Sequence, residues 1–562
     1  MVNVEHNAPA EMRDGTVLRA DVYRPANADA APVLLCRTPY DKAADAITNT
    51  ARELASKGYV AVVQDIRGRY ASDGTYAWMF QDGRGRSDAP DGFDTVEWAS
   101  NLSGGDGQVG AWGHSYPAWC AWELAATRPP GLKAMFPSGM SSRLRDLNFG
   151  IFETGRRLQW TYNMAVDARR RLGEEGGPAS RQEADTWWQE VERGKWIWHL
   201  PLDEIPDRVF SSLAPLLKRY LSEQNKEFWA FDEDHEQVDV PVCMLTGWYD
   251  RLVGTIDNFS GMVENGPANL RDQHRLLIGP WGHSNGNLVR HQGPLDFGSH
   301  VDTTYTDEVT RWFDYTLKGI DTGIGSEPPI KLFVMGENRW RFEESWPPQG
   351  ARTVDFFLRS GGSANTVWGD GELSVHEPKD ERPDEYDYDP RDPVMSLMDA
   401  NAQSAPRDQS PLNGRSDILV YTTPPLSSPL TVIGPVELKL WVASTAPDTD
   451  FTAKLIDVHP SGLAVNLSYG ILRASYRDGY DDPKLMQPST PYELTIKLNP
   501  TGIRFGEGHR IRVDISSSDF PNFDRHHNTA ADFWSDAELR VAHQTIFHDV
   551  ERPSRLSLPV VS

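Results

Sequence analysis

The first part of the chain alternates short apolar runs with stretches that have helical spacing. The apolar runs, each bounded by turn residues, occupy 31–41, 58–74 and 132–140 and predict buried strands. Helical spacing at about 43–57 and 91–100 predicts helices between them. Strands that alternate with helices of this length are typical of crossover units in a mostly parallel sheet.

This alternation stops after residue 142 and later resumes. Residues 143–238 are rich in Arg, Glu and Trp, contain no strand-like run, and predict helices inserted above the sheet as a cap. Further strands are predicted at 241–250, 274–284 and 330–340, with an amphipathic helix at 306–319 before the last of them.

Beyond about residue 350 the period of the pattern changes to two. Segments such as 434–445, 450–462 and 509–521 alternate apolar with polar residues and are separated by Gly, Pro and Asp turns. This pattern predicts a β-sandwich of the jelly-roll type. The acidic, proline-rich segment 379–393 is predicted to be a solvated loop.

These patterns divide the chain into four segments. Residues 1–142 and 239–348 are the two parts of an α/β core, 143–238 the helical cap, and 349–562 the jelly-roll β-sandwich. A length of 562 residues agrees with several domains, because single cores seldom exceed about 250–300 residues.

Composition then excludes several functional classes. The formal net charge of −25 argues against nucleic-acid and membrane partners, because both nucleic acids and anionic membranes attract basic surfaces. No segment is long and apolar enough to cross a membrane, and the N-terminus lacks the pattern of a secretion signal. The three cysteines lie in apolar runs and are expected to be buried thiols, which favours the reducing cytoplasm. The sequence does not determine the oligomeric state, and it allows a homo-oligomer.

The stretch 108–124, QVGAWGHSYPAWCAWEL, carries the first catalytic signal. An apolar run enters a tight turn at Gly113 to Ser115, and helical spacing follows. Strand, sharp turn and helix form the nucleophile elbow of α/β-hydrolases, in which strain lifts the serine hydroxyl above the sheet. Gly113 suits the point where the strand and helix backbones nearly touch. Pro117 stands where the G-x-S-x-G motif has its last glycine, and it restricts Tyr116, so we expect some distortion of the elbow.

Two further strand ends carry matching residues. Asp250 follows one predicted strand and His283 follows the next, and functional groups gather at the carboxyl ends of strands in open α/β sheets. The order Ser115, Asp250, His283 is the nucleophile–acid–base order of α/β-hydrolases. His283 is suited to move the proton near neutral pH, and Asp250 to hold the imidazole and stabilise its charged form. We therefore predict a catalytic triad on an α/β-hydrolase core.

An oxyanion hole needs two donors aimed at the developing negative charge. The backbone N–H of Tyr116, free at the start of the helix, is one. The other usual donor is an N–H in the loop after an earlier strand, here 37–40, but Pro39 has no N–H. We predict that the Tyr40 hydroxyl replaces it, since Pro39 stiffens the turn that positions this side chain.

The motifs around these residues are RTPYDK (37–42), QDIRGRYASDG (64–74), GHSYPA (113–118), GWYD (247–250), GPWGH (279–283), PPIKLFVMGENRW (328–340) and DQSPLNGRSDILVYTTPPL (408–426). Together they resemble the cocaine esterase-like, X-Pro dipeptidyl-peptidase (S15) family over nearly the whole chain. The resemblance implies an α/β-hydrolase core, a helical cap and a C-terminal jelly roll. It also implies catalytic roles for Ser115, Asp250 and His283, and an oxyanion hole at Tyr40 and Tyr116. Ala118 replaces the last glycine usual in the family elbow.

The substrate pocket is expected under the cap. Aromatic and apolar side chains dominate small-molecule pockets, and we predict that Trp160, Trp248 and Leu252 contact the substrate. Other tryptophans of the cap are further candidates for an acyl or aromatic pocket: Trp187, Trp188, Trp196 and Trp198.

We predict a serine hydrolase that cleaves small carboxylic esters through an acyl-enzyme, a route that requires no cofactor. No metal is expected, because His114 and the pair His526-His527 lack the spacing of a metal motif. The nearest alternative is amide chemistry, by an X-Pro dipeptidyl-peptidase or an α-amino-acid ester hydrolase or acyltransferase. Carboxylates would then bind a substrate ammonium group, with candidates in the cap at Asp203, Glu204 and Asp207. A carbohydrate-binding jelly roll and a non-catalytic hydrolase fold are the remaining alternatives.

Overall fold

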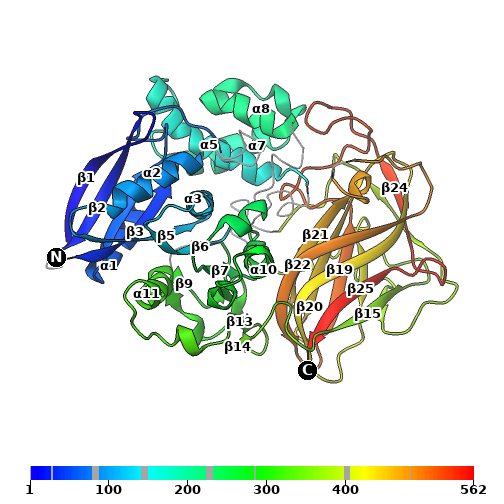
Figure 1. Ribbon diagram of the computed structural model, residues 1–562. Helices are drawn as coiled ribbons and strands as arrows, with labels where there is room; N and C mark the ends of the chain where they lie inside the picture. Colours follow the sequence, from blue (N-terminus) through cyan, green and yellow to red (C-terminus); the bar gives the residue numbers. More distant parts are fainter. Residues whose placement is uncertain are drawn as a thin grey trace.

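The structure, a computed structural model, describes residues 2–26, 30–78, 88–140, 150–222, 232–283, 287–397, 405–480 and 482–561. Figure 1 shows an α/β part, blue to green, beside a β part, yellow to red. The helices α5 (Thr154–Leu172), α7 (Arg193–Trp196) and α8 (Ala214–Ser222) lie along the top of the view (Figure 1). The molecule therefore has three parts, as the pattern of the sequence predicts.

A ten-stranded sheet forms the centre of the α/β part. Its strands in spatial order are β1 (Val2–Glu11), β2 (Val17–Pro25), β4 (Val60–Asp65), β3 (Ala31–Thr38), β5 (Gly105–His114), β6 (Leu132–Ser138), β7 (Cys243–Gly247), β8 (Arg275–Gly279), β13 (Ile330–Val334) and β14 (Arg339–Glu343). The run from β4 to β13 is parallel, whereas β1, β2 and β14 pair antiparallel at the two edges. The prediction of a mostly parallel sheet is confirmed.

Helices cover both faces of this sheet. They are α1 (Asp45–Ser56), α2 (Ala89–Ser100), α3 (Tyr116–Ala126), α10 (Thr255–Asn265) and α11 (Tyr305–Thr316). α1 packs beside α11, and α2 packs beside α3. All six residues of β4 are buried. Strands covered on both faces lose the alternation of half-exposed strands, which is why these segments read as continuous apolar runs.

The chain between β6 and β7 forms helices and turns wherever the structure describes it. Besides α5, α7 and α8 it contains α6 (Arg181–Trp187) and several short 3-10 turns. The buried guanidinium of Arg69, in the loop after β4, donates to the Met164 carbonyl (3.2 Å) and lies 3.6 Å from the Asp167 carboxylate. These contacts hold α5 over the carboxyl ends of the strands, where the sequence predicts the cap.

The C-terminal part is a β-sandwich built from one continuous set of paired strands. The strands are β15 (Arg352–Arg359), β16 (Glu372–Ser374), β17 (Asp384–Tyr388), β18 (Leu419–Thr422), β19 (Leu430–Ser444), β20 (Asp450–Val458), β21 (Ala464–Arg473), β22 (Tyr492–Phe505), β23 (Arg510–Ser516), β24 (Ala542–Phe547) and β25 (Arg555–Val561). The long strand β19 pairs with β22, β24 and β25. The sandwich joins the core through β22, because Met335 after β13 exchanges backbone hydrogen bonds with Gly502 (2.9 Å) and Arg504 (2.8 Å).

The prediction of a solvated loop at 379–393 is wrong over residues 384–388. These residues form β17, which pairs with β24 and buries every second side chain. The buried Asp384 carboxylate accepts hydrogen bonds from the Tyr421 hydroxyl (2.8 Å), His548 Nε2 (2.9 Å) and the Ala364 N–H (2.8 Å). The period-two pattern inside the acidic segment outweighs its charge, since the inward carboxylate finds donors on β18, just after β24 and in the loop after β15.

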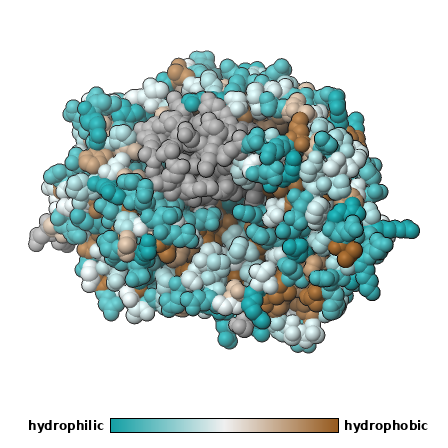
Figure 2. Space-filling view, turned by 45° about the vertical axis from the view of Figure 1, so that its right-hand side comes forward, coloured by the Kyte–Doolittle hydropathy of each residue, from teal (hydrophilic) through white to brown (hydrophobic). Residues whose placement is uncertain are grey.

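Figure 2 shows mostly hydrophilic residues, with apolar residues scattered in small groups. Among the described helices, none is both long and apolar enough to cross a membrane.

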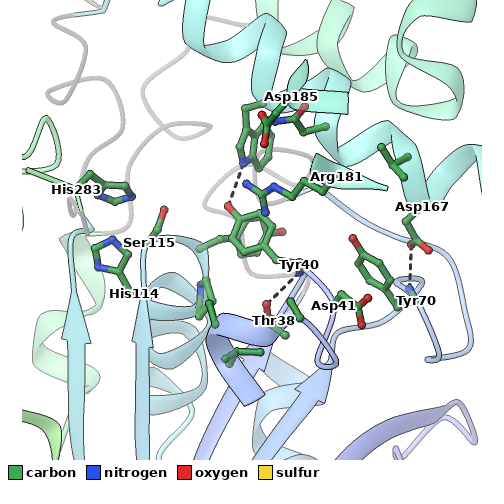
Figure 3. Close-up of a pocket in the computed structure, with 18 of the residues that line it drawn as sticks. Thr38, Tyr40, Asp41, Tyr70, His114, Ser115, Asp167, Arg181, Asp185 and His283 are labelled. Carbon is green, nitrogen blue, oxygen red and sulfur yellow. Dashed lines mark hydrogen bonds between the residues drawn. The ribbon is translucent and has the colours of Figure 1, made fainter. Parts of the chain in front are cut away.

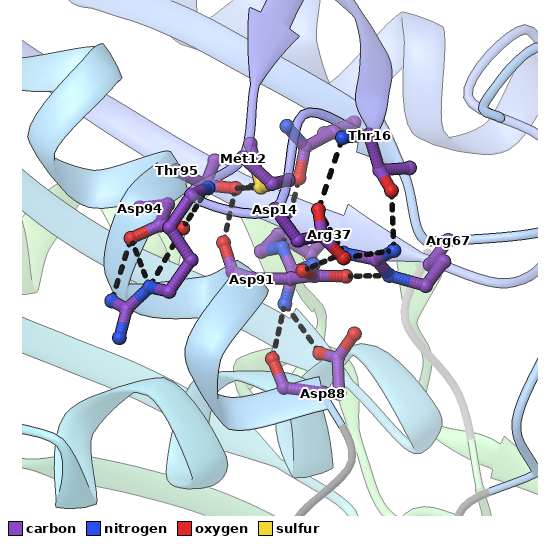
Figure 4. Close-up of polar contacts among 11 residues, drawn as sticks. Met12, Asp14, Thr16, Arg37, Arg67, Asp88, Asp91, Asp94 and Thr95 are labelled. Atoms are coloured by element: carbon purple, nitrogen blue, oxygen red, sulfur yellow. Dashed lines mark hydrogen bonds and ion pairs between the residues drawn. The ribbon is translucent and has the colours of Figure 1, made fainter. Parts of the chain in front are cut away.

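A buried ion pair fixes the start of α2 against β3 in the interior of the sheet (Figure 4). The Arg37 guanidinium at the end of β3 contacts the Asp88 carboxylate before α2, and its Nε donates to Gln64 (2.8 Å). The side chains are 0% and 8% exposed. Close by, Arg67 donates to Asp91 (2.6 Å) on α2 and forms an ion pair with Asp14 (2.8 Å) in the β1–β2 turn.

Removing one partner of the buried pair is expected to be costly. In Arg37→Leu the Asp88 carboxylate stays buried without its cation, and we expect the free energy of unfolding to fall by about 3–5 kcal/mol. Urea denaturation measures this change. Lys218→Leu breaks an ion pair with Asp207 near the surface and is expected to cost at most about 1 kcal/mol. Equal losses in the two variants would contradict the role of the Arg37 pair.

A buried histidine makes the fold sensitive to acid. Burial, helped by the charge of Arg275, lowers the pKa of His274 to about 4. Its Nδ1 accepts the Val242 N–H (3.3 Å), which a protonated ring cannot do. Because the unfolded chain binds this proton near pH 6.5, stability decreases as the pH falls from about 6.5 to 4, by about 3 kcal/mol.

We expect His274→Gln to flatten the acid limb of the stability curve, measured by urea denaturation at each pH. His376→Gln, on an exposed histidine, serves as the control and should leave the curve unchanged. If the acid limb is unchanged in His274→Gln, groups other than His274 cause the loss of stability in acid.

Candidate active site

Ser115 lies on a strained turn between β5 and α3. Its backbone has φ 62° and ψ −127°, a conformation that side-chain-bearing residues rarely adopt. A Cβ on Gly113 would overlap the backbone of Pro117 and Ala118, so only glycine lets strand and helix approach this closely. The Ala118 N–H (2.9 Å) and Trp119 N–H (3.1 Å) donate to the Ser115 carbonyl. Pro117 thus fits a regular first turn, and the expected distortion of the elbow does not occur.

Asp250 and His283 lie just beyond the neighbouring strands β7 and β8. The His283 Nδ1 is 3.0 Å from Asp250 Oδ1 and 3.1 Å from Oδ2, and the carboxylate also accepts the Leu252 N–H (2.8 Å). Burial opposes ionisation of Asp250, but the charge and hydrogen bond of His283 outweigh it, so the Asp250 pKa lies below its usual range. Asp250 is therefore a carboxylate that orients the imidazole.

Ser115 and His283 share one cavity of about 770 Å³ under the cap. In Figure 3 the Ser115 hydroxyl points into the cavity between the His283 ring and Tyr40. No hydrogen bond joins Ser115 to His283 in this conformation of the described residues. The Ser115 hydroxyl therefore has to move before it can donate to His283.

Tyr40 reaches the same cavity from the loop after β3. Its hydroxyl accepts a hydrogen bond from the Trp160 indole N–H (3.0 Å), and the Arg181 guanidinium lies 4.6 Å from the centre of its ring. Burial raises the pKa of the Tyr40 phenol, and the Arg181 charge offsets this only in part. The hydroxyl therefore stays protonated and can donate. Tyr116 is the first residue of α3, where backbone N–H groups lack intrahelical acceptors.

His114, for which the sequence predicted no catalytic role, contacts the predicted base. Its ring centre lies 4.2 Å from that of His283, and its Nδ1 is 3.0 Å from Ser138 Oγ. Burial and the charge of His283 lower the His114 pKa well below its usual value, so the ring stays neutral. Its place next to Ser115 at a strand end is the sequence signal that could have revealed it.

The structure places two of the three predicted pocket residues in the cavity lining and the third elsewhere. Trp160 and Leu252 line the cavity. Trp248 does not: its indole is buried in the core against Gly502 and donates to the Phe333 carbonyl (2.6 Å), because the strand end directs it away from the cap. The following residues are likewise not among those that line the cavity: Trp187, Trp188, Trp196, Trp198, Asp203, Glu204 and Asp207.

The described His, Cys and carboxylate groups gather closely enough for a metal at Asp457, His459 and His509, in the C-terminal part. Their contacts fit a hydrogen-bonded pair, with His509 Nδ1 2.8 Å from Asp457, beside the tilted His459 ring, whose centre lies 4.5 Å from that of His509. His526 and His527 are buried and lie 3.4 Å from Asp448 and 3.7 Å from Asp536. None of these groups lines the cavity of Ser115.

Two family profiles match the chain. Residues 14–285 match the X-Pro dipeptidyl-peptidase (S15) family, and residues 322–557 match the X-Pro dipeptidyl-peptidase C-terminal non-catalytic domain. The cocaine esterase of Rhodococcus sp. (strain MB1 Bresler) is 34% identical over 588 residues, which cover 100% of this chain and 99% of that protein. A putative Xaa-Pro dipeptidyl-peptidase of Streptomyces avermitilis is 24% identical, over 82% of this chain and 67% of that protein.

Solved structures have the same architecture. An alpha-amino acid ester hydrolase superposes with a TM-score of 0.81 and 25% identity, covering 100% of this chain and 97% of that one. An aminopeptidase from a marine sediment archaeon, Thaumarchaeota archaeon, superposes with a TM-score of 0.82 over the same shares at 23% identity, which supports the fold. The strained serine, the aspartate–histidine pair and the full-length similarity lead to one conclusion: the chain belongs to the cocaine esterase-like, X-Pro dipeptidyl-peptidase (S15) family of serine hydrolases.

Proposed function

We propose that the protein is a serine carboxylesterase that cleaves ester bonds through an acyl-enzyme. The observation that carries the proposal is the strained Ser115 elbow, which opens into the same cavity as the Asp250-bound His283. A serine nucleophile, a histidine base and an orienting carboxylate are the elements of acyl transfer in α/β-hydrolases.

In the first step the Ser115 hydroxyl turns toward His283, loses its proton to Nε2 and attacks the ester carbonyl. Asp250 holds Nδ1–H and stabilises the imidazolium that forms. The neutral His114 ring adds no competing positive charge beside it. The imidazolium then protonates the departing alcohol.

The oxyanion of each tetrahedral intermediate is held by the Tyr40 hydroxyl and the Tyr116 N–H. Trp160 donates to the Tyr40 oxygen, which orients the phenol proton toward the cavity. Water, activated by His283, finally attacks the acyl-enzyme, and the acid leaves from Ser115. This chemistry uses side chains and backbone alone.

Ester chemistry ranks above amide chemistry for two reasons. Identity to the cocaine esterase is 34% over the whole chain, against 24% to the putative Xaa-Pro dipeptidyl-peptidase. The carboxylates suggested for an ammonium group lie away from the cavity lining, and Asp207 forms an ion pair with Lys218 (2.7 Å). Hydrolysis of an X-Pro anilide without hydrolysis of p-nitrophenyl butyrate would reverse this ranking.

The proposal extends to partners and location. A small-molecule ester is the expected substrate, and the net charge of −25 supports neither nucleic acid nor an anionic membrane as a partner. Cys36, Cys120 and Cys243 are buried free thiols, which supports a location in the reducing cytoplasm.

Ser115→Ala removes the nucleophile, and we expect kcat for p-nitrophenyl butyrate to fall by a factor of about 10⁵ with the fold unchanged. A fluorophosphonate probe should label the unsubstituted protein and Ser222→Ala, a variant of an exposed cap serine, but not Ser115→Ala. Labelling of Ser115→Ala to the same extent would refute the assignment of the nucleophile.

Tyr40→Phe deletes one oxyanion donor and keeps the ring. We expect kcat to fall by a factor of about 10²–10³ with little change in KM, because the donor acts mainly in the transition state. Steady-state kinetics with p-nitrophenyl butyrate measure both constants. Tyr70→Phe alters another tyrosine of the cavity lining and should change kcat much less. Similar effects of the two variants would assign Tyr40 to packing alone.

A further inference from the structure

A second residue of the cap contacts the proposed oxyanion donor. Tyr40 lies in the loop after β3, and its hydroxyl accepts the Trp160 indole N–H (3.0 Å). The guanidinium carbon of Arg181, at the start of α6, lies 4.6 Å from the centre of the Tyr40 ring. In Figure 3 the Arg181 side chain points toward Tyr40. The hydroxyl and the ring face of one phenol are therefore both in contact with the cap.

The first turn of α6 is fixed by side-chain caps, which hold the backbone of Arg181 in place. Ser180 is the N-cap, and its hydroxyl oxygen accepts the Glu183 N–H (3.1 Å). The Glu183 carboxylate reaches back and accepts the Ala179 N–H (2.7 Å). This exchange resembles a capping box, which satisfies the free N–H groups at the start of a helix.

Contacts between α6 and α5 explain where the Arg181 side chain goes. Opposite charges four residues apart on a helix often form an ion pair, and Asp185 lies four residues after Arg181. Asp185 Oδ1 instead accepts the side-chain amides of Asn163 (2.6 Å) and Gln159 (3.1 Å) on α5. Arg181 contacts the Tyr40 ring, so its positive charge lies beside the proposed oxyanion site.

A cation on the face of a tyrosine ring affects how strongly the hydroxyl donates. The ring face has a negative potential and attracts the cation. When the hydroxyl donates to an oxyanion, negative charge shifts toward the phenol oxygen and ring, and a nearby cation stabilises this shift. Burial raises the pKa of Tyr40, and the charge of Arg181 already acts against this rise. Because Arg181 is exposed where it lines the cavity, we expect a modest effect that salt weakens.

We propose that Arg181 is a positioning residue of the reaction, which acts through Tyr40 and strengthens the Tyr40 hydroxyl as an oxyanion donor. The proposal rests on the esterase function proposed above. An oxyanion forms at this donor in both tetrahedral intermediates, so Arg181 promotes acylation and deacylation alike. A cap helix that carries no residue of the triad then contributes to stabilisation of the transition state.

Arg181→Gln tests the charge. We expect kcat for p-nitrophenyl butyrate to fall by a factor of about 5 with little change in KM, because the charge acts mainly in the transition state. Arg181→Lys keeps a cation without the planar group and should lose less. Added salt should reduce the difference between the unsubstituted enzyme and Arg181→Gln. If Arg181→Gln fails to fold, Arg181→Met, which keeps an unbranched stem, takes its place.

The same substitution in the Tyr40→Phe variant separates action through the hydroxyl from packing. Tyr40→Phe keeps the ring that Arg181 contacts, but it has no hydroxyl for the cation to strengthen. Arg181→Gln should therefore change kcat by a factor close to one in this background. Arg170 provides the matched control, because its guanidinium carbon lies 5.6 Å from the centre of the Tyr70 ring in the same cavity lining. Arg170→Gln should change kcat much less than Arg181→Gln does.

An unchanged kcat in Arg181→Gln, with Tyr40→Phe still impaired, would overturn the role of Arg181 and leave the esterase intact. A loss of equal size with and without the Tyr40 hydroxyl would assign the effect to packing and overturn the role as well. An equal loss in Arg170→Gln would do the same, because it would show a general effect of charge in the cavity. Absence of hydrolysis by the unsubstituted protein, together with absence of fluorophosphonate labelling, would overturn the proposed function itself.

Discussion

The close approach of β5 and α3 at Ser115 is the constraint on which the site depends. Ser115 keeps its strained backbone because the flanking strand and helix are packed into the core and Gly113 leaves no side chain between them. The turn exposes the hydroxyl at the carboxyl edge of the sheet and directs the first N–H groups of the helix toward the same point. The proposed nucleophile and oxyanion donor are thus placed by one piece of backbone geometry.

The parallel sheet turns this local feature into the proposed catalytic site. β5, β7 and β8 run in the same direction, so residues that follow them meet at one edge although they are far apart in sequence. Asp250 binds His283 there, and the buried, neutral His114 supports the imidazole from the strand that leads to Ser115. The cap adds Trp160, which fixes Tyr40.

Charged side chains from both the cap and the core line the cavity. Arg156 and Arg157 from the cap and Arg251 from the loop after β7 all line the cavity, and Glu153 contacts the first two. The aspartates of the same cavity serve as acceptors for neighbouring amides, a backbone N–H and Arg170.

Local pattern in the sequence determined the elements of the core, the helical insertion, the period-two sandwich and the triad residues, since each depends on neighbours within one strand or turn. Tertiary structure alone decided which side chains face the cavity. Trp248 and Leu252 lie four residues apart after the same strand, yet one enters the core and the other the pocket. Asp384 is buried because donors far along the chain, at Tyr421 and His548, reach its carboxylate. Periodicity along the sequence indicates which residues are buried. The direction of each side chain and its hydrogen-bond partners depend on contacts between segments far apart in the chain.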